Sequence, residues 1–194
     1  MLGETQLRTR SKLIIWISIV ALSIVLLIIG YSYLYVVFPK GLLEQGVNRL
    51  SEVVEEGLKS SKDSSIDLIL RLTLTIMANN AIANTLFALP FVGPLFYVYT
   101  IVFTGAILRY YVELYTKSIP HEKIMLSLLT TPHTYIEFLA YAIALTESII
   151  LTTVIVKTIV NRKHLLGYLA MLCISYAVLF LAAFVEALTM YFFL

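Results

Sequence analysis

The run LIIWISIVALSIVLLIIGYSYLYVVF, from Leu13 to Phe38, contains no charged residue and decides the class of fold. A helix needs roughly 20 mostly apolar residues to cross the ~30 Å hydrocarbon core of a bilayer. Arg8, Arg10 and Lys12 precede the run, as in a signal peptide. The run is longer than the apolar part of a signal peptide, which has about 7–15 residues, and no small-residue cleavage site follows it. We therefore expect a retained membrane anchor.

Further apolar stretches follow this anchor along the chain. Residues 66–115 form a block that Pro90, Gly93 and Pro94 interrupt, which indicates two spans joined by a tight turn. Another stretch starts at Thr131-Pro132, a cap followed by a proline that suits the first helical turn. The sequence thus predicts an all-α, polytopic membrane bundle in a single domain, residues 1–194. Its five transmembrane helices are expected at about 13–38, 66–89, 94–115, 132–156 and 165–194.

The composition excludes several classes of protein. The chain has 194 residues, of which 60% are hydrophobic and 13% charged, and its mean hydropathy is +0.91. Soluble domains have about 45–50% apolar and about 25% charged residues, so a soluble enzyme, a disordered tail and a fibrous repeat are excluded. The net charge is +2 and Lys and Arg form no dense run, so no nucleic-acid partner is expected. The lone Cys173 allows no intrachain disulfide.

Two short segments outside the spans are predicted to be amphipathic interfacial helices. In residues 40–59 the apolar residues recur at helical spacing opposite a mildly acidic face; they are Leu43, Val47, Leu50, Val54 and Leu58. We expect this helix to lie at the interface and to dock on its own bundle or on another protein. A short surface helix is expected at 120–129, beginning at Pro120.

The basic residues in the loops predict the orientation in the cell membrane. With the N-terminus in the cytoplasm, the inner segments hold Arg8, Arg10, Lys12, Lys157, Arg162 and Lys163. The outer segments then hold Lys40, Arg49, Lys59, Lys62, Arg71, Arg109, Lys117 and Lys123, offset by acidic residues within 40–71. Basic residues beside the first helix usually dominate. We therefore expect a multi-pass protein with its N-terminus cytoplasmic and its C-terminus outside.

Polar side chains within the spans are costly in lipid and are the candidates for a functional site. They are Asn79, Asn80 and Asn84 in the second span, Arg109 in the third, His133, Glu137 and Glu147 in the fourth, and Glu186 in the fifth. We expect them at two depths. His133, Glu137, Glu186, Arg109 and Glu113 should lie toward the outer leaflet. Asn79, Asn80 and Glu147 should lie nearer the midplane, where the asparagine amides could bond the carboxyl group.

Two interpretations of this polar cluster remain open. In the first, the residues are structural, with interhelical hydrogen bonds and with Arg109 neutralising one carboxylate. In the second, the outer group is a functional site, because three carboxylates against one arginine exceed what pairing requires. His133 and Glu137 could reach one metal ion, but the zinc pattern HExxH is absent and no second histidine lies in a span. We expect no metal, no cofactor and no enzyme, since no nucleophile–base set, CxxC pair or phosphate loop is present.

Five segments together carry a family resemblance. They are Asn79-Asn80, Pro90-Phe91-Val92-Gly93-Pro94, Gly105, Pro132-His133 with Glu137, and Ala182-Ala183-Phe184-Val185-Glu186-Ala187. Over roughly residues 10–194 the chain resembles the stage II sporulation protein M family, most specifically in Pro-His-x-x-x-Glu. That family commonly has glycine after the histidine, where this chain has Thr134. In spore-forming bacteria the family member belongs to a complex that localises cell-wall-degrading enzymes during engulfment, so the resemblance implies a membrane scaffold.

The sequence therefore favours a non-enzymatic membrane scaffold or assembly component. It would bind other membrane proteins or a second copy through the 40–59 helix and through small-residue faces such as Ala140, Ala144, Ser148 and Thr152. The alternative is a small transporter or permease subunit that uses the polar stripe of the fourth span. Five spans are few for a stand-alone carrier, so this alternative implies a homodimer or an ATPase partner.

Overall fold

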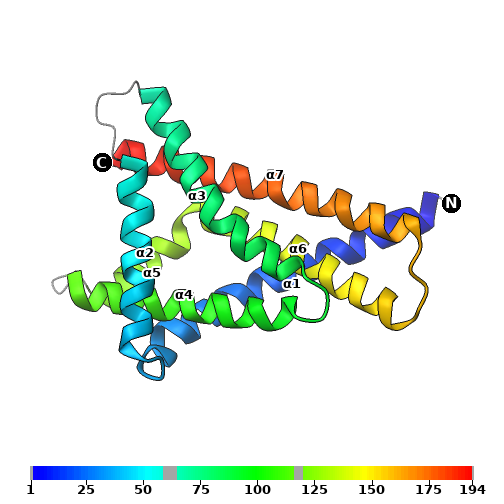
Figure 1. Ribbon diagram of the computed structural model, residues 1–194, viewed down its shortest axis with the longest axis horizontal. Helices are drawn as coiled ribbons and strands as arrows, with labels where there is room; N and C mark the ends of the chain where they lie inside the picture. The colour runs from blue at the N-terminus through cyan, green and yellow to red at the C-terminus, as the bar shows by residue number, and fades with distance from the viewer. Residues whose placement is uncertain (1, 59–64, 116–119, 194) are drawn as a thin grey trace.

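The computed structural model describes the backbone of residues 2–58, 65–115 and 120–193, and within these ranges it contains helices and no strand. The order of the helices is α1 (Leu2–Ser32), the 3-10 helix η1 (Leu34–Val36), α2 (Lys40–Leu58), α3 (Ser65–Ala88), α4 (Gly93–Tyr115), α5 (His121–Thr130), α6 (Pro132–Val156) and α7 (Arg162–Phe193). Figure 1 shows them packed as one bundle. The prediction of an all-α fold is confirmed.

Five of these helices are long and apolar enough to cross a membrane, which confirms the predicted number of spans. They are α1 over Ser11–Ser32, α3, α4, α6, and α7 over Arg162–Phe192. The first span ends at Ser32 rather than at residue 38, and η1 then turns the chain toward α2. Pro39 separates η1 from α2, because a proline removes an N–H and disfavours helical geometry in the residue before it.

The spans alternate in direction, so the two ends of the bundle differ (Figure 1). The beginning of α1, the α3–α4 turn and the α6–α7 loop lie at one end, which we call the N-terminal end. Helix α2 and the C-terminal end of α7 lie at the other, which we call the α2 end. Helix α6 is the most buried span and contacts α1, α3, α4 and α7. The residues of α6 can therefore meet partners from most of the bundle.

The α3–α4 turn rests on the small-residue face of α6. The backbone N–H of Phe91 donates to Thr152 Oγ1 at 2.8 Å, and Ser148 Oγ donates to the Leu89 carbonyl at 2.6 Å. A Cβ on Gly93 would overlap the carbonyl oxygen of Phe87, so glycine is needed for this close approach. The face that the sequence offered to another protein is thus occupied by the chain itself.

Helix α2 docks on its own bundle. It packs against α3 and α4 and buries Leu43 and Val47, while Leu50 is exposed. Tyr110 donates a hydrogen bond from its hydroxyl to Glu44 Oε1 at 3.1 Å. The side chains of Val54 and Leu58 lie outside the described residues. Of the two docking modes that the sequence left open, the structure therefore shows the intramolecular one.

Candidate functional site

Polar side chains from four spans meet at one cavity of about 400 Å³. Helices α3, α4, α6 and α7 form most of its wall, and α2 contributes residues from the α2 end. Its polar lining consists of Arg49, Asn79, Asn80, Thr100, Thr104, His133, Thr134, Glu137, Tyr141 and Glu186. Five of the eight residues that the sequence singled out are among them: Asn79, Asn80, His133, Glu137 and Glu186. These five residues therefore share one space, with the asparagines and the acidic group in the lining of the same cavity.

Helix α6 presents three of the polar groups along one face. His133, Glu137 and Tyr141 are spaced four residues apart, so they stack on one side of the helix. The Tyr141 hydroxyl donates to Glu137 Oε1 at 2.6 Å. Nδ1 of His133 is buried and has no hydrogen-bond partner within the described chain. The face therefore offers one carboxyl group that is partly satisfied and one imidazole nitrogen that is free to bind.

The start of α6 is fixed by two threonines. Thr131 precedes the helix, but its hydroxyl donates to the Leu128 carbonyl at 2.6 Å and makes no capping bond to the helix. Thr134, where the resembled family commonly has glycine, is buried and also donates to the Leu128 carbonyl, at 3.2 Å. These bonds attach the end of α5 to α6. They hold the first turn of α6, and His133 with it, in place beside the cavity.

Helix α7 contributes Glu186. Ala182, Ala183 and Ala187 around it are buried, and these small side chains let α7 pack closely on α3 and α6. Among the described residues no hydrogen-bond or ion-pair partner of Glu186 is found. Glu186 and Glu137 line the same cavity from two different helices. Two carboxyl groups thus line one space, and neither makes an ion pair within the described residues.

Helices α3 and α2 complete the polar wall. Asn79 Nδ2 donates to Asn80 Oδ1 at 3.4 Å, and both side chains are half-buried. Gly46 of α2 meets the side chain of Ile107 in α4, where a Cβ would overlap it, so α2 comes close enough for Arg49 to line the cavity. The cavity contains two carboxyl groups and one guanidinium, with amide and hydroxyl groups that can donate or accept.

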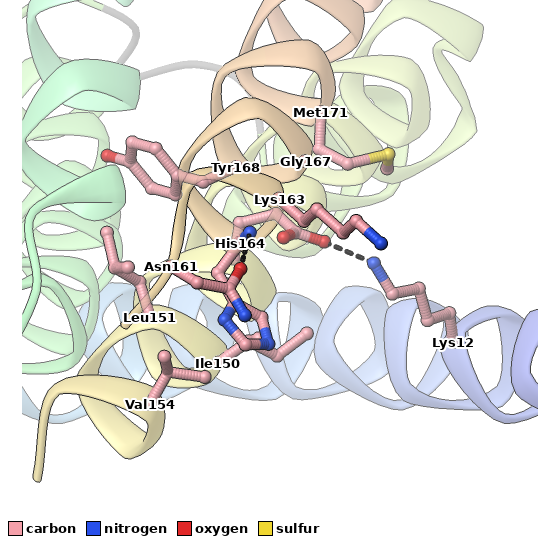
Figure 2. Close-up of a pocket in the computed structure, with 11 residues that line it drawn as sticks. Lys12, Ile150, Leu151, Val154, Asn161, Lys163, His164, Gly167, Tyr168 and Met171 are labelled. Atoms are coloured by element: carbon pink, nitrogen blue, oxygen red, sulfur yellow. Dashed lines mark hydrogen bonds and ion pairs between the residues drawn. The ribbon is translucent and has the colours of Figure 1, made fainter. Parts of the chain in front are cut away.

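Glu147 lies at a different place from the one expected. Its Oε1 is 2.5 Å from Lys12 Nζ at the beginning of α1, and both residues line a second cavity near the N-terminal end (Figure 2). Ten residues of helix separate Glu147 from Glu137, which is about 15 Å along the axis and roughly 80° around it. Steps of three and four residues keep neighbouring members of the pattern on similar sides of α6, but the rotation becomes large over ten residues. The prediction that Glu147 would meet Asn79 and Asn80 is therefore wrong.

Arg109 and Asn84 also lie apart from the residues that line the cavity. Arg109 Nε pairs with Glu113 Oε1 at 3.0 Å, and its guanidinium lies over the rings of Tyr31 and Tyr35. Arg109 therefore neutralises one carboxylate, which is the structural role that the sequence left open. Asn84 is fully buried, and the single hydroxyl proton of Ser175 is shared between Asn84 Oδ1, at 2.9 Å from Ser175 Oγ, and the Ala140 carbonyl, at 2.8 Å. Both residues connect helices.

Sequence reasoning missed two residues that matter at these sites. Arg49 belongs to an interfacial helix, and nothing in its local pattern shows that it lines a cavity. Lys12 was expected only as a flanking charge, although a charged residue at the start of one span can reach an acid near the end of an antiparallel span. A helix-pairing scheme with α1 antiparallel to α6 would have provided this signal.

The chemistry that the cavity can support depends on the groups that line it. Across the described ranges, no group of three or more His, Cys, Asp or Glu side chains is placed to hold a metal ion. Comparison of the chain with models of protein families, with curated proteins and with solved structures finds no match. The function must therefore be argued from the cavity itself. What the cavity offers is a small polar space with excess carboxyl groups inside an apolar bundle.

Proposed function

We propose that the chain is a non-enzymatic membrane subunit of a transport complex, whose cavity binds a small cation or a protonated amine. The observation that carries this proposal is the convergence of Glu137 and Glu186, from two different spans, on one cavity of about 400 Å³. Ionisable residues inside a bundle are costly and usually mark a pathway for ions or solutes. Among the described residues that line the cavity, Arg49 is the one with a permanent positive charge, so the two carboxyl groups favour a positively charged ligand.

The surfaces that the sequence offered for binding a partner, on α2 and on α6, mostly make contacts within the chain instead. Helix α2 buries Leu43 and Val47 on its own bundle, and Ser148 and Thr152 bind the α3–α4 turn. The polar cavity is not accounted for by packing in the same way, because Glu186 and Nδ1 of His133 have no partner among the described residues. Buried polar groups are normally satisfied by protein, water or a ligand. This difference favours transport over assembly alone.

Binding of radiolabelled methylammonium to the full chain in lipid nanodiscs tests the proposal. We expect saturable binding that is about tenfold weaker or more in Glu137→Gln and in Glu186→Gln, because each variant removes a charge-assisted contact. Glu122→Gln is the matched control, since Glu122 is an exposed residue of α5 outside the cavity. Equal binding in all three variants would contradict the assigned site.

Water access to the cavity is a second test. In a Cys173→Ala background, Ala83→Cys places a thiol in the cavity wall, while Ala78→Cys places one on the exposed face of the same helix. A membrane-impermeant maleimide should label Ala83→Cys and should leave Ala78→Cys unlabelled, because the control thiol faces lipid. If both thiols resist the reagent, the polar residues are structural and the transport proposal fails.

A membrane scaffold is the second candidate, favoured by the resemblance of Pro132-His133 with Glu137 and of residues 182–187 to the stage II sporulation protein M family. A transport subunit with five spans also needs a second copy or an ATPase, so both proposals expect a partner. Purification of the chain in a mild detergent should recover that partner in stoichiometric amount. An ATPase or a homodimer supports the transport subunit, whereas a peptidoglycan hydrolase complex supports the scaffold.

A further inference from the structure

A second cavity lies at the N-terminal end of the bundle, away from the proposed transport site. It has a volume of about 370 Å³ and lies between the beginning of α1, the last turns of α6 and the first turns of α7 (Figure 2). Its polar lining consists of Lys12, Glu147, Asn161, Lys163, His164 and Tyr168. Ile150, Leu151, Val154 and Met171 form an apolar wall beside them. The cavity is therefore amphipathic, with one basic side and one hydrocarbon side.

The positive charge on the basic side is only partly neutralised. Among the side chains that the structure describes, Glu147 is the one carboxylate that lines the cavity, and Lys12 pairs with it at 2.5 Å. For Lys163, no ion-pair partner is found in the described part of the chain. Nδ1 of His164 is buried and has no hydrogen-bond partner there either. The Lys163 ammonium group and one nitrogen of the His164 imidazole thus have no partner in the described part of the chain.

The start of α7 adds to the positive potential of this cavity. Asn161 Oδ1 accepts a hydrogen bond from the backbone N–H of His164 at 3.1 Å, which fixes the first turn of the helix. The first turn of a helix carries the positive end of its dipole. Lys157 and Arg162 are exposed at the same end of the bundle. The surroundings of the cavity therefore attract an anion, and they do so at a membrane surface.

The geometry points to a phosphate-bearing headgroup of an anionic phospholipid as the occupant of this cavity, held by Lys163 and His164 next to the Lys12–Glu147 pair. A phosphate group accepts several charge-assisted hydrogen bonds, which ammonium and imidazole groups supply. The apolar wall distinguishes a lipid from a free anion, because acyl chains can lie along it while the headgroup occupies the basic side. Basic pockets between spans bind lipid headgroups in this manner.

Lipid retention by the full chain tests this site. The protein is purified from nanodiscs that contain phosphatidylcholine with phosphatidylglycerol as the anionic probe, and bound lipid is counted by native mass spectrometry. We expect preferential retention of phosphatidylglycerol, about tenfold weaker in Lys163→Gln because one charge-assisted contact is lost. Lys157→Gln is the matched control, since it removes the same charge from an exposed position outside the cavity. This control should retain the lipid as the unmodified chain does.

Three results would overturn the assignment. Equal losses in Lys163→Gln and Lys157→Gln would show diffuse attraction by the basic surface instead of a site. Equal retention of phosphatidylcholine and phosphatidylglycerol would show that the cavity does not select an anion. Inorganic phosphate added at constant ionic strength is the third arm. If phosphate displaces phosphatidylglycerol from the unmodified chain, and if it also stabilises the chain against unfolding in phosphatidylcholine nanodiscs, the occupant is a free anion and not a lipid.

Discussion

Glu147 is a buried acid, and its charge is neutralised by an ion pair with Lys12. It is 5% exposed, and its partner Lys12 is one-quarter exposed, so the pair lies where water screens it weakly. Such a pair contributes little in net terms, because burying two charges costs about as much as their attraction returns. Removing one partner is different, since the remaining charge is left buried alone. Lys12 is therefore tied to the bundle by the acid of α6.

Replacing this lysine should destabilise the bundle strongly. We expect Lys12→Met to lower the free energy of unfolding by about 3–5 kcal/mol, the usual cost of a buried charge without a partner. The double variant Lys12→Met with Glu147→Leu should recover most of the loss. Thermal unfolding of the four proteins of this cycle in one detergent measures both effects. A double variant as unstable as the single one would show that the pair does not act as a unit.

Ser175 is the residue that joins three helices through one hydroxyl. Its Oγ lies 2.9 Å from Asn84 Oδ1 and 2.8 Å from the Ala140 carbonyl, so α7 is connected to α3 and α6. Hydrogen bonds between membrane helices contribute about 0.6–2 kcal/mol each. Ser175→Ala should lower the free energy of unfolding by about 1–2 kcal/mol, measured by denaturation in mixed micelles. Ser18→Ala on the exposed face of α1 should change it little.

At the scale of elements, α1 and α4 approach each other through paired glycines. A Cβ on Gly30 would overlap the Val102 carbonyl oxygen, and one on Gly105 would overlap the Leu27 carbonyl oxygen and meet the Tyr31 nitrogen at 2.8 Å. Both positions face the backbone of the other helix, which cannot move aside as a flexible side chain can. The crossing therefore requires residues without a Cβ, and it determines where the α2 end of α1 lies.

A single methyl group should separate these helices. Gly105→Ala should lower the free energy of unfolding by about 1–3 kcal/mol through overpacking. Gly167→Ala on α7 is the matched control, because nothing lies within 4 Å of its added Cβ. The control should raise stability by up to about 1 kcal/mol, since alanine is the better helix former. Unfolding of both variants in the same detergent provides the comparison, and equal effects would contradict a close glycine crossing.

The sequence predicted the helices well because their signals are local. An uncharged run, a proline or a glycine defines where a helix begins and ends, as at Gly93 and Pro132. Which polar residues meet depends instead on how each helix is rotated and how far it slides along its neighbour. His133 and Glu137 lie on one face of α6 and line the same cavity, whereas Glu147 lies on another face and contacts α1. The position of Arg49 beside the cavity depends on the angle at which α2 crosses the bundle, and no local sequence pattern predicts that angle.

For the whole molecule, the two ends of the bundle carry different charge. By sequence the N-terminal end has Arg8, Arg10, Lys12, Lys157, Arg162 and Lys163, with Glu4 and Glu147 as its acids. The α2 end has basic and acidic residues in similar number within 40–71. Its Arg109 pairs with Glu113, so that charge is compensated. The uncompensated basic charge is concentrated at the N-terminal end.

This asymmetry predicts that the N-terminal end faces the cytoplasm in the cell membrane, because short basic segments stay on that side. Alkaline phosphatase fused after residue 194 should then be active, and a green fluorescent protein inserted at residue 160 in the α6–α7 loop should be fluorescent. Alkaline phosphatase at residue 160 should be inactive, which serves as the control. The reverse pattern would contradict the orientation and would place the basic cavity at the outer surface. Because headgroup charge differs between leaflets, the same fusions decide which leaflet supplies the lipid that we assign to that cavity.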